Sequence, residues 1–120
     1  NTFYESYFEE TYEEIFKMEL PNEYNLIAKD YERESGLFGN ENWTARLSFN
    51  EKDYTKLLNY VKNENQMLLK DHTDNPLTDC KTGDKIIYSI ATKYMNPWNY
   101  NIDFFEDKKT FRLTMIVYGD

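Results

Sequence analysis

The sequence predicts an α+β domain in which an antiparallel sheet of four to five strands carries two helices packed on one face. Apolar residues recur every three or four positions in two segments and alternate with polar residues in several others. The elements follow the order α-β-β-α-β-β-β, and strands joined by short turns usually pair with one another. At 120 residues the chain can bury one ordinary core, so residues 1–120 are expected to form a single domain.

The first helix is predicted over residues 3–20. Its apolar positions are Tyr4, Tyr7, Phe8, Tyr12, Ile15 and Phe16, with glutamates between them. Thr2 is expected to cap this helix, and Glu5 completes a capping box. Pro21 is expected to end it, because proline disfavours a helical preceding residue and cannot donate to the helical ladder.

A hairpin of two strands is expected next. The first strand covers residues 24–34, with Leu26 and Ala28 on one face and the three residues Ile27, Lys29 and Tyr31 on the other. Residues 35–40 are rich in turn formers and connect it to the second strand. That second strand alternates Trp43, Ala45, Leu47 and Phe49 with polar residues, which indicates one buried face.

The remaining elements begin with a second helix from about residue 51 to residue 65, with Asn50 as its N-cap and Asp53 three residues on. Residues 70–84 contain many loop formers and little periodicity, so they are expected to form a long surface connection.

The last part of the chain is predicted to be β-structure. Residues 85–95 fit either period, and their β-branched content favours a strand. Residues 102–106 are expected to pair with residues 110–118 across a turn at Asp107 and Lys108. Phe111, Leu113, Met115 and Val117 share the face of the last strand that should lie in the core.

Negative charge is concentrated at the start of the chain. Residues 1–34 contain ten acids and three bases, a balance of −7, whereas residues 35–120 contain twelve acids and eleven bases, a balance of −1, which gives the total of −8. This field argues against nucleic acid or an anionic membrane surface as a partner of the first helix. A basic protein partner is expected instead.

Large apolar residues in predicted connectors are the best candidates for a contact surface, because aromatic side chains dominate binding hot spots. Leu37 and Phe38 lie in the first connector, and Trp98 and Tyr100 lie in the segment 96–101. The alternative is that these side chains fold back to cover an edge of the sheet. With the acidic helix, the predicted binding residues are Glu9, Glu13, Leu37, Phe38, Trp98 and Tyr100.

Few residues suggest catalysis or a metal. His72 and Cys80 are the single histidine and the single cysteine, and a Cys–His pair could form a reactive thiolate if the two met in space. The aspartates of the same loop, Asp71, Asp74, Asp79 and Asp84, do not match the twelve-residue calcium loop. No glycine-rich phosphate motif is present. No catalytic residue, metal or cofactor is therefore predicted.

The predicted function is that of a non-catalytic protein-interaction domain of inhibitor, immunity or accessory type. Two alternatives stay open: a small enzyme that uses Cys80 and His72, and a small-ligand binder with aromatic side chains around a hollow. No segment has the ~20 apolar residues of a membrane span. The chain begins with Asn1 rather than Met, so it is expected to be either a processed mature protein or a chain trimmed of an upstream segment. The compartment stays open, with an extracytoplasmic location favoured.

Overall fold

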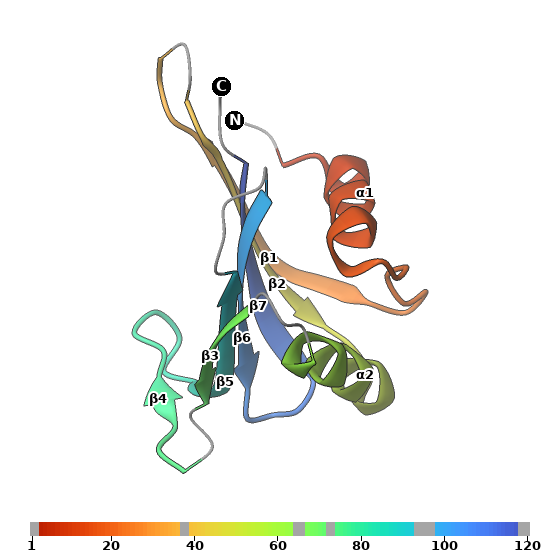
Figure 1. The fold of residues 1–120 in the computed structure, drawn as a ribbon, viewed down its shortest axis with the longest axis vertical. Helices are drawn as coiled ribbons and strands as arrows, with labels where there is room; N and C mark the ends of the chain where they lie inside the picture. Colours follow the sequence, from red (N-terminus) through yellow and green to blue (C-terminus); the bar gives the residue numbers. More distant parts are fainter. Residues whose placement is uncertain (1–2, 37–38, 64–66, 72–73, 93–97, 118–120) are drawn as a thin grey trace.

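The computed structural model describes residues 3–36, 39–63, 67–71, 74–92 and 98–117, and Figure 1 shows the fold. The helices of this part of the chain are α1 (Glu5–Phe16) and α2 (Glu51–Lys62). The strands are β1 (Asn25–Arg33), β2 (Glu41–Ser48), β3 (Met67–Asp71), β4 (Leu77–Thr78), β5 (Lys85–Thr92), β6 (Trp98–Phe105) and β7 (Thr110–Val117).

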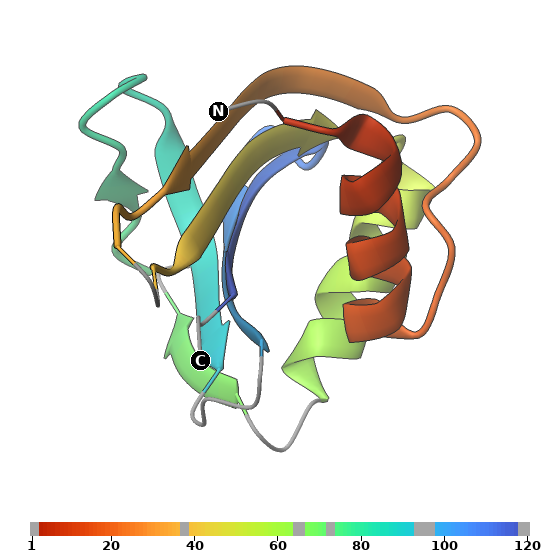
Figure 2. The same ribbon diagram turned by 90° about the horizontal axis from the view of Figure 1, so that it is seen from above.

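The described strands form one antiparallel sheet in the order β1-β2-β7-β6-β5-β3, and the short β4 also pairs with β5. The last strand of the chain therefore lies between β2 and β6, in the middle of the sheet. Figure 2 shows that the sheet is strongly curved and that both helices lie on its concave side. The α+β class and the antiparallel pairing are as predicted.

The predicted number of strands was too low. Part of the expected surface loop, residues 70–84, instead completes β3 and forms β4, which add to the sheet beside β5. Strand β3 is five residues long and β4 is two residues long. Both are too short for the period of their apolar residues to distinguish a strand from a loop.

Helix α1 is shorter than predicted at its C-terminal end. It ends at Phe16, because Lys17 takes a left-handed backbone conformation (φ 55°) while its N–H group donates to the Glu13 carbonyl oxygen. Pro21 is therefore not the residue that stops the helix. Tyr4 is the N-cap and has no capping side-chain hydrogen bond, and the predicted cap Thr2 lies outside the described residues.

Helix α2 begins as predicted. The Asn50 side chain accepts a 2.8 Å hydrogen bond from the N–H group of Asp53, which satisfies one of the free donors of the first turn. The helix ends at Lys62, three residues before the predicted end.

The main core fills the space between the concave face of the sheet and the two helices. The helices contribute Phe8, Tyr12, Phe16, Tyr54, Leu57 and Val61. The sheet contributes Trp43, Ala45, Leu47, Tyr88, Ile90, Tyr100, Ile102, Phe104, Phe111, Leu113 and Met115. The predicted inward face of the last strand is thus confirmed for Phe111, Leu113 and Met115.

A β-bulge in β1 changes which of its side chains face the core. The register shifts between Leu26 and Ala28, so Leu26 pairs with Leu47 whereas Ala28 pairs with Arg46. Leu26 packs against the core, and the Ala28 position is exposed. The prediction that these two residues share a face is therefore wrong, because a bulge interrupts the strict alternation of a strand.

A second bulge, between Ile86 and Tyr88 in β5, places Ile86 opposite Phe105 and Tyr88 opposite Phe104. Tyr88 and Phe104 belong to the main core. Ile86 and Phe105 are also buried, but they lie outside that cluster. Phe105 follows the inward-facing Phe104, so this second apolar pair lies on the convex face of the sheet.

Candidate functional site

Of the six residues predicted to form a binding surface, the structure describes the side chains of Glu9, Glu13 and Tyr100. Glu13 is exposed and Glu9 is half-buried on α1, while Leu37 and Phe38 lie outside the described residues. Trp98 begins β6, and its side chain is outside the described part of the chain.

Tyr100 is a core residue rather than a loop residue. It lies in β6 and is 7 % exposed. Its ring packs edge-on against Phe16 of α1, with ring centroids 5.0 Å apart. The prediction of a connector over residues 96–101 is therefore wrong from residue 98 onward.

The acidic α1 surface consists of Glu5, Glu9, Glu10, Glu13 and Glu14. The Tyr24 hydroxyl, at the start of the hairpin, donates a 3.3 Å hydrogen bond to the Glu5 carboxylate. Desolvation, then the carboxylates of Glu9 and Glu5, raise the pKa of Tyr24 to about 12. In the described part of the chain, every ion pair is made by Arg46 or Arg112, so none neutralises this helix.

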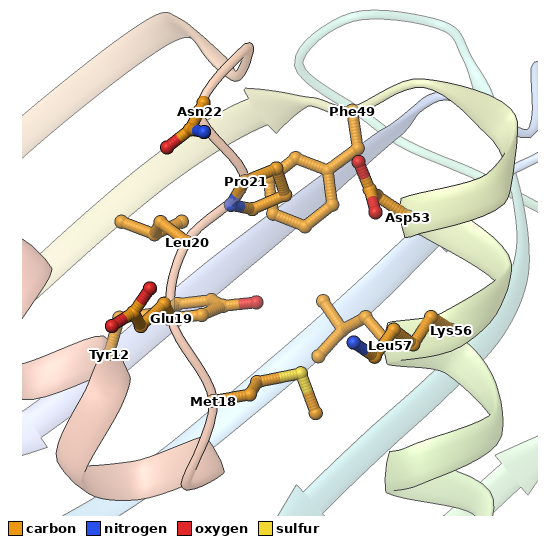
Figure 3. A pocket seen from close by; sticks show the side chains of 10 residues that line it. All are labelled: Tyr12, Met18, Glu19, Leu20, Pro21, Asn22, Phe49, Asp53, Lys56 and Leu57. Carbon is orange, nitrogen blue, oxygen red and sulfur yellow. The ribbon is translucent and has the colours of Figure 1, made fainter.

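A pocket of 370 Å³ lies between α2 and the connector that joins α1 to β1 (Figure 3). The connector contributes Met18, Glu19, Leu20, Pro21 and Asn22. The opposite wall is formed by Phe49 and by the α2 residues Asp53, Lys56 and Leu57, and Tyr12 comes from α1. The lining thus combines apolar side chains with several polar and charged groups.

The pocket exists because α1 ends early. The left-handed Lys17 turns the chain out of the helix, and Leu20, which is buried, holds the connector against the core. If the helix continued to residue 20, as its sequence pattern suggests, the connector wall would not be present. The local sequence does not predict this turn, because Lys17 is neither glycine nor asparagine, the residues that usually adopt a left-handed conformation at a helix end.

Tyr12 provides the innermost polar group of the pocket. Its side chain is 1 % exposed, and Figure 3 shows its hydroxyl directed into the space between the connector and α2. No described residue forms a hydrogen bond with this hydroxyl. Burial, and secondarily the charge of Asp53, raise the pKa of Tyr12 well above its usual range, so the phenol is un-ionised at neutral pH.

Asp53 and Lys56 contribute opposite charges from one wall of the pocket. They lie three residues apart on α2, and neither takes part in an ion pair with a described residue. A carboxylate can only accept hydrogen bonds, whereas the phenol of Tyr12 can donate and accept. Lys56 can donate to an acceptor, but the lining also contains two carboxylates, Glu19 and Asp53, so the charge of the pocket favours a hydrogen-bond donor.

Asp79 and Asp84, two of the aspartates of residues 70–84, serve a structural role on the convex face. Asp79 pairs with Arg112 at 2.9 Å, and Asp84 pairs with Arg46 at 2.8 Å. Desolvation opposes ionisation of Asp79, but hydrogen bonds from Thr82 and Arg112 outweigh it and lower its pKa. Within the described ranges, no group of three or more His, Cys, Asp or Glu side chains is placed to hold a metal ion.

The two arginines also cover the second apolar cluster. The guanidinium carbon of Arg46 lies 3.9 Å from the ring centroid of Phe105, and that of Arg112 lies at 5.7 Å. Arg112 additionally forms a 2.9 Å ion pair with Asp103, which accepts a hydrogen bond from Ser89. This network attaches the β4–β5 loop to the sheet.

The predicted Cys–His pair cannot be assembled from the described residues. Cys80 is exposed in the β4–β5 loop, and His72 lies outside the described part of the chain. A small enzyme based on these two residues stays a prediction, which the rate of Cys80 alkylation near neutral pH would test.

No family model, curated protein or solved structure matches this chain. None of the helices that the structure describes is long and apolar enough to cross a membrane. The acidic α1 surface and the pocket at its C-terminal end are therefore the features on which a functional argument can be built.

Proposed function

We propose that this chain is a non-catalytic interaction domain that binds a basic protein partner through the acidic α1 surface and the adjoining pocket. The observation that carries this proposal is the uneven neutralisation of the acidic residues. Asp79, Asp84 and Asp103 on the convex face are paired with arginines, whereas no described residue forms an ion pair with the α1 glutamates.

An uncompensated acidic helix favours association with a positively charged protein. The field of the helix speeds its encounter with a partner of opposite charge. Added salt screens this field, and the Debye length is about 8 Å at physiological ionic strength. The same field repels nucleic acid and anionic lipid surfaces.

Exposed aromatic residues supply apolar contact area beside these charges. Tyr4 is 64 % exposed and Tyr7 is 39 % exposed, and both lie at the N-terminal end of α1. Tyrosine combines a large ring with a polar hydroxyl and is common at the centre of protein interfaces. The proposed interface therefore runs from these two tyrosines along α1 to the pocket at its other end. An inhibitor, immunity or accessory role is consistent with such a surface.

The test is capture of partners by the purified domain, at low and high salt, from lysate and secreted fractions of the source. The test variant is Glu9→Gln/Glu13→Gln, and the matched control is Glu32→Gln/Glu106→Gln, which removes the same charge from exposed positions on β1 and the β6–β7 turn. We expect a basic partner that associates more slowly with the test variant than with the control. Equal association with both variants, or a rate that does not depend on salt, would remove α1 from the interface.

A further inference from the structure

We propose that the pocket between the connector and α2 receives a lysine or arginine side chain of the partner. The apolar part of that side chain would lie on Met18, and its cation would lie between Asp53 and the hydroxyl of Tyr12. This inference rests on the proposed function, because it assigns the anchor of the basic partner.

The unpartnered hydroxyl of Tyr12 is the first argument. Tyr12 as a whole residue is 1 % exposed, but its hydroxyl is open to the pocket rather than enclosed by protein. Tyr54 is buried to a similar extent, and its hydroxyl donates to the Phe105 carbonyl oxygen at 2.8 Å. Tyr12 has no such partner among the described residues, and its hydroxyl faces the pocket in Figure 3. A bound group can therefore reach this hydroxyl and form a hydrogen bond with it.

The chemistry of Asp53 restricts what that group can be. A carboxylate accepts hydrogen bonds and does not donate, so a group placed beside Asp53 must be a donor. An ammonium or guanidinium group can donate to Asp53 and also to the phenol oxygen of Tyr12. The Tyr12 hydroxyl hydrogen can rotate about the C–O bond, which leaves a lone pair of the oxygen to accept. Asp53 and Tyr12 both line the pocket, and the Asp53 charge contributes to the raised pKa of Tyr12. An anionic group would be attracted by Lys56 but repelled by the two carboxylates of the lining, Glu19 and Asp53.

The rest of the lining fits the stem of a basic side chain. Lysine and arginine carry three or four methylene groups that pack on apolar surface while the charged end makes polar contacts. Of the apolar lining residues, Met18 is half-buried and offers the most accessible surface, whereas Leu20, Phe49 and Leu57 are buried. The pocket volume of 370 Å³ accommodates one such side chain. Lys56 is the one like-charged residue of the lining and is expected to weaken binding.

The experiment uses three blocked amino acids as probes in NMR titrations of the whole chain. N-acetyl-lysine methylamide and N-acetyl-arginine methylamide carry the cation, and N-acetyl-norleucine methylamide has a similar stem without it. We expect the cationic probes, at millimolar concentration, to shift the backbone amide resonances of Glu19, Asn22 and Asp53. The norleucine probe should shift them much less.

Two substitutions test the assigned contacts. Tyr12→Phe removes only the hydroxyl and should weaken binding of the cationic probes about tenfold. Lys56→Met removes the repulsive charge and should strengthen it about threefold. Lys52→Met removes the same charge from an exposed position on α2 that does not line the pocket, and it should have little effect.

Equal shifts with the norleucine probe, or unchanged affinity in Tyr12→Phe, would overturn the assignment of a cation beside Tyr12. No shift of the pocket resonances with any probe would overturn the pocket as the anchor site. The two proposals can fail separately. If the helix alone formed the interface, the pocket would not bind the probes, but Glu9→Gln/Glu13→Gln would still weaken association with a basic protein partner.

Discussion

The hydroxyl of Tyr54 donates a 2.8 Å hydrogen bond to the main-chain carbonyl of Phe105 and thereby joins α2 to the end of β6. Tyr54 is 2 % exposed, so this bond is made away from water. Its counterpart on α1, Tyr12, is equally buried but directs its hydroxyl into a pocket. The two tyrosines therefore differ in that one hydroxyl joins two elements of the fold and the other faces a pocket.

The first prediction compares the stabilities of Tyr54→Phe and Tyr12→Phe. Tyr54→Phe should lower the free energy of unfolding by about 1–2 kcal/mol, because the Phe105 carbonyl loses its side-chain donor in a buried site. Tyr12→Phe should change it by less than about 0.5 kcal/mol, because no hydrogen bond within the described chain is lost. Urea denaturation monitored by circular dichroism measures both. Equal losses would show that the Tyr12 hydroxyl has a structural partner.

The second prediction concerns Arg112, which binds Asp79 and Asp103 on the convex face. Arg112→Met should lower the free energy of unfolding by about 2–3 kcal/mol, because it leaves the 6 % exposed carboxylate of Asp79 without its cation. The control Arg33→Met removes the same charge from an exposed position on β1 and should cost less than about 0.5 kcal/mol. Similar losses in both would mean that the network does not hold the β4–β5 loop.

Regular alternation and clear caps account for the parts of the fold that the sequence predicted. The Asn50 cap defined the start of α2, and the alternating residues 43–49 defined β2. The inward face of β7 followed from the same pattern. These elements depend on contacts between neighbouring residues in sequence or on one buried face, which a single sequence displays directly.

The sequence did not predict the features that depend on a single residue or on contact with a distant strand. The bulges at Ile27 and Ile87 reverse the faces of their strands without any change in composition. The partners of Asp79 and Asp84 come from β7 and β2, far away in the chain. For the candidate site, Glu9 and Glu13 were predicted, but the pocket was not, because it depends on the position at which α1 ends.

The third prediction tests that end. Lys17 adopts φ 55°, a conformation that glycine adopts without the strain of a side chain. Lys17→Gly should therefore raise the free energy of unfolding by about 0.5 kcal/mol, net of the greater freedom of glycine in the unfolded chain. Glu14→Gly, an exposed position inside α1, should instead lower it by about 1 kcal/mol. Thermal unfolding of both variants measures the difference. Destabilisation by Lys17→Gly would contradict a left-handed end at this residue.

The fourth prediction concerns acid pH and the carboxylate of Asp79. Hydrogen bonds from Thr82 and Arg112 outweigh desolvation and lower its pKa below the unfolded value of about 4. A group whose pKa is lowered by folding contributes stability that is complete above the unfolded pKa and is lost as the pH falls through the folded pKa. The stabilising effect of Asp79 should thus be full at pH 7 and should decline below about pH 4.

The measurement is the difference in free energy of unfolding between wild type and Asp79→Asn at a series of pH values. We expect the wild type to be more stable at pH 7 and the difference to shrink below about pH 4, because the wild-type carboxyl then also becomes neutral. Asp74→Asn is the control for loss of a charge in the same segment, since Asp74 makes no ion pair with a described residue. A difference that grows as the pH falls would mean that burial, rather than Arg112 and Thr82, governs the ionisation of Asp79.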